Sequence, residues 1–290
     1  GLAGGASYDI RRTFTVPTDL ATEAYYVFVV TDPNRYDARG AVFEDENERN
    51  NQRGSAVPMV IELPPPTDLV VTDVDVPDRA RSGEPVAFAW TVTNQSAVAA
   101  SGTWTDSLFL SEDSVWDIND RPLGRGTYSG TLNAGESYTL SLDTLLPGTA
   151  PGHYRVIVRT DIFNQVHEGV DEANNRTASP EDLEVAVDEM LIGTPLALTL
   201  ANGQEKLLQI KVPRDQTLRI TLKASDDQSA NEIFVRHDAV PTSAKFDATY
   251  TGPLSSDLTA IIPSTDPGTY YVLVRNFRAD ADGVPVPLLA

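Results

Sequence analysis

An internal repeat constrains the fold of this sequence more than any other feature. Four pairs of segments recur in the same order and at nearly constant spacing: residues 5–8 and 135–138, 15–17 and 145–147, 25–32 and 154–161, and 42–51 and 166–175. The first copy differs in spacing only by a few extra residues in one loop. Since chance does not produce such collinear similarity, the chain holds the second half of one module and then a complete copy of it.

Consecutive prolines at positions 64–66 separate the two copies. Proline has a fixed φ and no backbone N–H, so this stretch cannot join a central strand and predicts a short, stiff linker. We therefore divide the chain into a half-module (1–63), a linker (64–67), a complete module (68–188) and a different module (189–290).

The complete module shows seven strand-like runs separated by turn residues. They are residues 69–76, 85–93, 104–111, 123–132, 137–145, 153–160 and 183–187. Most runs alternate, as where Val86, Phe88 and Trp90 share one face of a strand. Seven short strands of this kind predict an immunoglobulin-like β-sandwich, with the tryptophan in its core.

The last part of the chain lacks the repeat signature but is again strand-like. Its runs are residues 196–200, 206–212, 217–223, 232–237, 258–262 and 269–275, and one more strand starts near the C-terminal end of the sequence. The predicted fold is all-β: tandem immunoglobulin-like β-sandwiches followed by a jelly-roll-like or related β-sandwich, which could lack its last strand.

Charge and cysteine content narrow the partners and the compartment. The chain has 42 acidic and 22 basic residues, a formal net charge of −20, which repels nucleic acid and anionic lipid but attracts cations such as calcium. The simpler interpretation is that acidity keeps a long protein soluble. The absence of cysteine rules out disulfides and thiolate chemistry and favours a bacterial protein over a eukaryotic secreted one. No apolar run is long enough to insert in a membrane, and any export signal would lie outside this piece.

Several short motifs of the complete module resemble a known family. Residues 68–71, 90–94, 104–106, 110–113, 134–138, 164–168 and 172–175 resemble CARDB, the cell-adhesion-related domain found in bacteria. Residues 1–62 are similar to the C-terminal half of that domain. The segment from Met190 resembles, through 193–195, 200–203, 212–213, 234–236 and 268–274, the bacterial pre-peptidase C-terminal domain. Both resemblances imply non-catalytic β-sandwich modules of exported proteins, with no catalytic residue to transfer.

The residues themselves show no catalytic motif. The three histidines, His153, His167 and His237, form neither a zinc-binding pair nor part of a recognisable nucleophile motif. We therefore expect no enzyme activity, no catalytic residue and no cofactor-binding residue in this piece.

Two acidic loops are candidate calcium sites. Asp113, Asp117, Asn119 and Asp120 lie in one short turn, and calcium takes six to eight oxygen ligands. The turn has neither the central glycine nor the closing glutamate of an EF-hand loop, and Asp and Asn also favour ordinary turns.

The second cluster contains Asp161, Glu168, Asp171 and Glu172, followed by an asparagine pair, Asn174 and Asn175. Its counterparts in the half-module are Asp32, Glu44, Asn47, Glu48, Asn50 and Asn51. We favour a structural explanation over a metal: the carboxylates accept backbone N–H bonds, and the asparagines turn the chain into the last strand.

Trp116 is the one tryptophan in a polar loop. It could stack on a sugar or a partner, although a cover over the end of the sandwich is the simpler interpretation.

Three functions fit these features. The first is a non-catalytic structural or adhesive array of a large secreted or cell-surface bacterial protein, in which partners are other modules or neighbouring subunits. The second is a set of accessory domains of a large exported hydrolase or peptidase, and the third is a carbohydrate-binding module that contacts surface glycans. The half-module has too few strands to close a sandwich, so we expect either a fragment or completion by strand addition from another chain.

Overall fold

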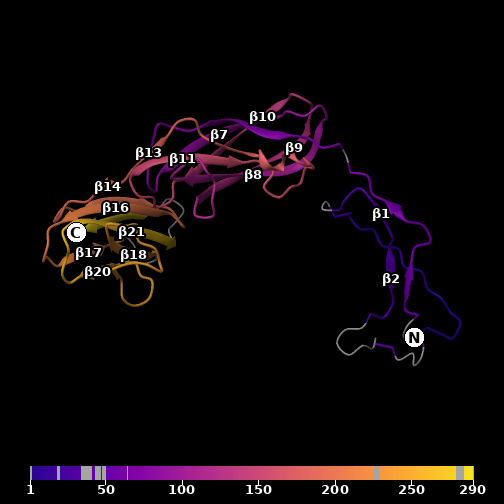
Figure 1. Cartoon of the computed structure of the whole chain (residues 1–290). Helices are drawn as coiled ribbons and strands as arrows, with labels where there is room; N and C mark the ends of the chain where they lie inside the picture. Colours follow the sequence, from indigo (N-terminus) through magenta and orange to yellow (C-terminus); the bar gives the residue numbers. More distant parts are fainter. Residues whose placement is uncertain are drawn as a thin grey trace. The chain divides into compact units, whose positions relative to one another are not determined.

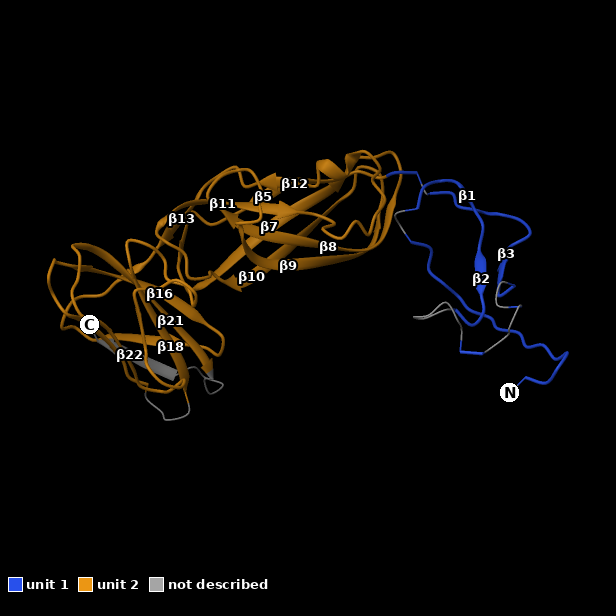
Figure 2. Cartoon of the chain, turned by 60° about the horizontal axis from the view of Figure 1, so that its bottom comes forward, with its two compact units in different colours: residues 1–66 blue, residues 67–290 orange. Residues whose placement is uncertain are grey.

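The computed structural model is built from β-strands, with a short 3₁₀ turn at Asp171–Ala173 (Figure 1). The structure describes residues 2–17, 20–33, 41–42, 47, 50–63, 65–224, 229–278 and 284–289. It forms two compact units, Gly1–Pro66 and Thr67–Ala290 (Figure 2). The all-β prediction is confirmed.

Unit 1 contains two small antiparallel ladders. Strand β1 (Ala24–Tyr25) pairs with β4 (Met59–Val60), and β2 (Phe28–Val30) pairs with β3 (Gln52–Gly54). Ile61 is the one buried apolar residue among the described residues of this unit. The described strands therefore enclose no core of their own. Glu44 and Glu48 lie outside the described residues.

The first part of unit 2 is a sandwich of two sheets. The three-stranded sheet has the order β10 (Ser137–Leu145), β7 (Pro85–Asn94), β5 (Leu69–Asp75). The six-stranded sheet has the order β6 (Arg79–Arg81), β13 (Leu183–Ala186), β11 (Gly152–Arg159), β8 (Ala100–Ser111), β9 (Arg121–Leu132), and β12 (Arg176–Ala178) also pairs with β11. This is the immunoglobulin-like sandwich that the alternation predicted. Its two extra strands, β6 and β12, are too short to show a period of two.

The core of this sandwich lies between the inward faces of the two sheets. Trp90 of β7 and Trp104 of β8 are both fully enclosed, at 1% and 0% exposure. The sheets pack so closely that a Cβ added at Gly126 would lie 2.6 Å from the Trp90 ring. Glycine is therefore required at this position of β9, since any side chain would displace the tryptophan.

The second part of unit 2 is another sandwich. Its five-stranded sheet has the order β14 (Asp188–Glu189), β16 (Glu205–Val212), β21 (Gly268–Arg278), β18 (Ala230–His237), β19 (Ala248–Thr249). Its four-stranded sheet has the order β15 (Leu196–Leu200), β22 (Val284–Leu289), β17 (Leu218–Leu222), β20 (Leu258–Ile262). Strand β22 lies between β15 and β17, so the run that only began to show in the sequence is a paired strand. A second apolar core fills this sandwich.

Candidate functional site

The first acidic loop lines one side of a cavity. Asp113, Asp117, Asn119 and Asp120 all line a cavity of about 410 Å³, and Arg121 lines it as well. The structure thus brings the four predicted residues together, but it places a guanidinium beside them.

All three aspartate carboxylates of this loop already accept hydrogen bonds from the loop itself. Asp113 Oδ1 accepts from the N–H of Val115 at 2.7 Å, and Asp120 Oδ2 accepts from the N–H of Asp117 at 2.8 Å. Asp117 Oδ1 accepts from the N–H of Asn119 at 2.6 Å. The loop is therefore stable as an ordinary Asp-rich turn, and calcium in it stays a prediction.

The second acidic cluster is held by similar bonds. Asp161, at a positive φ of 43°, accepts from the backbone N–H groups of Gln165 and Val166, each at 2.8 Å. Glu168 is 0% exposed and accepts from the Leu69 N–H and from Asn175 Nδ2. These contacts match the structural explanation that we favoured.

Two further predicted residues complete this loop. Asp171 begins the 3₁₀ turn, and Glu172 Oε1 accepts from the N–H of Glu168 at 3.2 Å. The buried Glu172 Oε2 and Asn175 Oδ1 have no hydrogen-bond partner among the described residues. Nevertheless, no three or more His, Asp or Glu side chains in the described part of the chain are grouped so that they could hold a metal ion.

Burial makes these carboxyl groups weaker acids. It raises the pKa of Glu168 to about 7, an effect that the Asn175 and Leu69 hydrogen bonds oppose and the charges of Glu172 and Asp161 reinforce. Burial also raises the pKa of Asp161, against its two backbone hydrogen bonds. The loop therefore takes up protons more readily than an exposed acidic turn.

Asp106 is a buried carboxylate that the sequence analysis did not single out. It is 0% exposed and accepts from Trp90 Nε1 at 2.7 Å, from the Tyr138 hydroxyl at 2.8 Å and from Thr160 Oγ1 at 2.7 Å. Burial raises its pKa although these donors oppose the rise. The alternation of residues along this strand could have indicated its burial, because Asp106 lies two residues after Trp104 and therefore on the same inward face. We assign it to cross-linking the two sheets.

Trp116 lies on the outer surface of the six-stranded sheet and not over the end of the sandwich. Its ring contacts Phe109 edge-on, with centroids 5.8 Å apart, and the Arg159 guanidinium lies 4.0 Å from its centre. Phe109 projects outward from β8, next to the inward Leu108 and Leu110. The simpler interpretation, in which Trp116 covers the end of the sandwich, is therefore wrong: the ring covers Phe109 on the outer face of the sheet.

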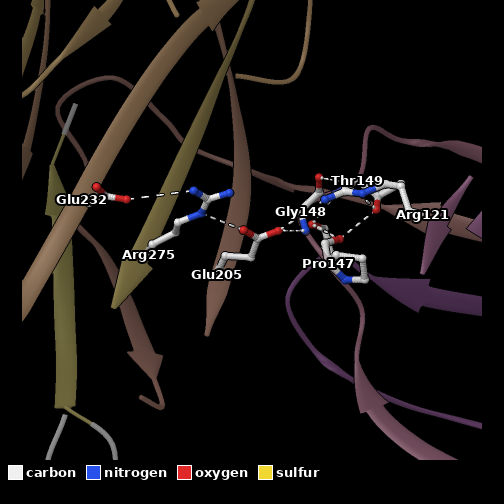
Figure 3. A network of polar contacts seen from close by, with 8 residues as sticks. Arg121, Pro147, Gly148, Thr149, Glu205, Glu232 and Arg275 are labelled. Carbon is white, nitrogen blue, oxygen red and sulfur yellow. Dashed lines mark hydrogen bonds and ion pairs between the residues drawn. The ribbon is translucent and has the colours of Figure 1, made fainter. Parts of the chain in front are cut away.

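The junction between the two sandwiches of unit 2 is a dense polar network, shown in part in Figure 3. Glu205, at the start of β16, accepts from the Gly148 N–H at 2.6 Å and pairs with Arg275 Nε at 2.8 Å. Arg121 reaches the same carboxylate at 3.5 Å and donates to the Gly148 carbonyl. One carboxylate thus joins the 146–149 turn of the first sandwich to two strands of the second.

A second group of charged residues also connects the two sandwiches at this junction. Lys206 is 7% exposed, and its Nζ lies 2.8 Å from both Glu84 and Asp188. Arg81 also pairs with Asp188. Burial, the largest influence, opposes the charged ammonium, but the hydrogen bonds and charges of the two carboxylates raise the pKa of Lys206 above its ordinary value. The ammonium therefore stays charged and paired.

The backbone at the junction leaves little freedom. Val187 is 8% exposed in a small apolar cluster with Leu207 and Leu273, and the next two residues pair with β16 as strand β14. A Cβ at Gly83, whose φ is +80°, would lie 2.5 Å from the Glu205 carbonyl oxygen. The segment that connects the two sandwiches, residues 187–189, is therefore itself part of the second sandwich. The turn at Gly83 of the first sandwich packs directly on β16 of the second.

The fold defines this chain as a series of β-sandwich modules. Within it, residues 66–179 match the CARDB family model, so this part of the chain is a CARDB domain, an adhesion-related β-sandwich. No curated protein matches the chain. No helix in the described residues is long and apolar enough to cross a membrane.

Solved structures resemble about two fifths of the chain. A CARDB domain from Pyrococcus furiosus, solved in complex with di-metal ions, is 22% identical, with 41% of this chain and 89% of that chain covered and a TM-score of 0.31. A β-glucosidase from Listeria innocua is 18% identical over 41% of this chain and 16% of that chain, with a TM-score of 0.28. A β-glucosidase from Erythrobacter marinus is 13% identical with the same coverage and TM-score.

Proposed function

We propose that this chain is a non-catalytic, stiff segment of a secreted or cell-surface bacterial protein, in which β-sandwich modules hold other modules at a fixed separation. The observation that carries the proposal is the junction of unit 2. An extended array transmits force, or fixes the distance between its ends, only if neighbouring modules do not rotate against one another. The small, polar interfaces found between most domains of a chain permit such rotation. Here the contact combines the Glu205 and Lys206 networks with a connecting segment, residues 188–189, that forms strand β14.

The energetics favour a fixed junction over a hinge. Exposed ion pairs contribute little, typically below about 1 kcal/mol. Lys206 and Glu205 are different, because their side chains are only 9% and 19% exposed and both have several partners. Swivelling would separate the buried Lys206 ammonium from Glu84 of the first sandwich. It would also separate Asp188 of β14 from Arg81 of β6. Breaking a buried pair costs about 3 to 5 kcal/mol.

Unfolding experiments test whether the two sandwiches act together. All three tryptophans lie in the CARDB part, so tryptophan fluorescence reports that sandwich alone. Ile220→Ala removes a fully buried side chain from the core of the second sandwich. With a stiff, coupled junction, this change also lowers the urea midpoint seen by tryptophan, and adding Glu205→Ala reduces the coupling. An unchanged tryptophan transition in Ile220→Ala would contradict the proposal.

Unit 1 supports a role for further segments or subunits as partners. Residues 25–32 correspond in the repeat to 154–161, which lie in and just after β11. Strand β11 pairs with β8 on one side and with β12 and β13 on the other. In unit 1 the corresponding β2 leaves Phe28 68% exposed. We infer that strands equivalent to β5 and β8, from another polypeptide segment, cover it.

Sedimentation of the full chain checks this inference. Uncovered apolar strands predict concentration-dependent association and binding of a hydrophobic dye, both reduced by Phe28→Ser. A full chain that stays monomeric and binds no dye would argue against strand completion.

The alternative function is a set of accessory domains of an exported hydrolase. It is supported by the resemblance of the second sandwich to the pre-peptidase C-terminal domain, through segments such as residues 268–274. The sequence of the whole natural polypeptide distinguishes the two, because only the alternative requires a catalytic domain in it.

A further inference from the structure

Four residues form a row across the outer face of the six-stranded sheet of the CARDB domain. Register pairs Arg125 of β9 with Ser107 of β8, Ser107 with Arg159 of β11, and Arg159 with Arg176 of β12. Residues directly opposite one another on neighbouring strands project from the same face. The residue before Ser107 and the one after it, Asp106 and Leu108, are buried at 0% exposure, and Leu108 packs in the core, so this is the outer face. We call these four residues the arginine row.

A groove of about 560 Å³ lies over this row. Six of its lining residues are Phe109, Pro122, Gly124, Arg125, Arg159 and Ile162. The groove thus combines an apolar floor with a guanidinium on each side. Between the two arginines lies only the small side chain of Ser107.

Each groove arginine is held against an aromatic ring. The Arg159 guanidinium carbon lies 4.0 Å from the centre of the Trp116 ring, and that of Arg125 lies 5.3 Å from the centre of the Phe163 ring. Stacking of this kind fixes the plane of a guanidinium and leaves its N–H edge free. The rings thus orient the two arginines without satisfying their hydrogen bonds.

The arginine row has no acidic partner of its own. In the described part of the chain, no ion pair or side-chain hydrogen bond involves Arg125, Arg159 or Arg176. This is unusual in a chain of net charge −20, where carboxylates are in excess. Like charges directly opposite on neighbouring strands also destabilise a sheet. Arg159 and Arg176 stand in this relation, so packing alone does not explain the row.

We propose that this groove binds an acidic polysaccharide, whose carboxylates pair with Arg125 and Arg159 while its sugar rings pack on Phe109 and Pro122. Planar guanidinium groups bind carboxylates in a bidentate manner. The two arginines stand two strands apart, about 10 Å between backbones, so the ligand must carry more than one carboxylate. Uronic acid polymers have this chemistry, with apolar ring faces between repeated carboxylates.

The position of the groove favours a glycan over an acidic peptide. Strand β8 lies between β9 and β11, so its backbone groups beneath the groove are already paired, and the free edge of β9 is on the side away from β8. An extended peptide recognised by strand addition needs such an edge. A sugar polymer needs only side chains and an apolar floor, which the groove supplies.

Calorimetric titration of the full chain with oligogalacturonate tests the proposal, with the fully methyl-esterified oligomer as the uncharged control. The free acid should bind, and the ester should bind at least tenfold more weakly. Arg125→Ala and Arg159→Lys should each weaken binding by roughly tenfold to hundredfold, in line with lost charge-assisted bonds. Raising salt from 50 to 500 mM should weaken it further.

Arg219→Ala is the matched control, because Arg219 is exposed on β17 in the other sandwich and carries the same charge. It should leave the affinity unchanged. Equal binding of acid and ester, equal loss in Arg219→Ala, or no heat at millimolar oligomer would overturn the proposal. Self-association of the chain would also overturn the proposal if Arg125→Ala abolished it. The groove would then bind an acidic surface of a second copy of the chain. None of these results would affect the stiffness of the junction, which is a separate proposal.

Discussion

Replacing Glu168 by glutamine tests the electrostatics of the second acidic loop. The carboxyl group is 0% exposed, and burial raises its pKa from 4.5 to about 7. The folded protein therefore binds this proton more tightly than the unfolded chain does. The resulting stability is fully present below about pH 4.5 and is lost as the pH rises through about 7. This rise in the pKa of Glu168 corresponds to about 3 kcal/mol in the free energy of unfolding.

Glutamine fits the site without a charge. Its carbonyl oxygen can accept from the Leu69 N–H as the glutamate does. Its NH₂ group would face Asn175, whose Oδ1 has no partner among the described residues and can accept once the Asn175 amide turns over. Glu168→Gln should therefore be more stable than the natural chain at pH 8, by up to about 3 kcal/mol, and nearly equal to it at pH 5.

Urea unfolding at pH 5 and pH 8, followed by tryptophan fluorescence, measures this difference. Glu181→Gln is the control, since Glu181 is exposed and only its backbone oxygen is hydrogen-bonded. It should behave like the natural chain. A Glu168→Gln variant that keeps the natural pH dependence, or is less stable at pH 8, would refute the assignment of the raised pKa to this buried carboxyl.

Two further predictions concern the CARDB domain. Gly126→Ala should lower its stability by about 1 to 3 kcal/mol in urea unfolding, because the new Cβ meets the Trp90 ring, whereas Thr127→Ala at the exposed neighbouring position should change it by less than about 0.5 kcal/mol. Calcium in the 111–120 loop predicts a rise in melting temperature with added calcium that chelator reverses and Asp117→Ala abolishes. Calorimetry without heat would remove calcium from that loop.

Much of the fold could be predicted from sequence because it rests on local alternation. The period of two that puts Phe88 and Trp90 on one face also sets the strand that buries them. Strands of two or three residues, such as β6 and β14, carry no such pattern and form only because longer neighbours offer a free edge. The run of β22 looked unfinished in the sequence, yet it lies inside a sheet.

The sites were less predictable, because they depend on contacts between distant residues. The sequence grouped Asp113 with Asp120, and the structure places both around one cavity, but the guanidinium of Arg121 beside them is visible only in three dimensions. The arginine row joins four strands and has no signal along the chain. The junction carboxylate Glu205 lies 57 residues from its partner Gly148. Such pairings follow from the sheet order.

Distance measurement across the junction of unit 2 tests the stiff-segment account most directly. The chain has no cysteine, so Asp143→Cys on β10 and Lys211→Cys on β16, both exposed, accept spin labels without interference. Pulsed electron paramagnetic resonance should give one narrow distance distribution, which broadens in Glu205→Ala and stays narrow in Glu181→Ala. A broad distribution in the chain with native Glu205 would show that the modules swivel, and the account would be wrong.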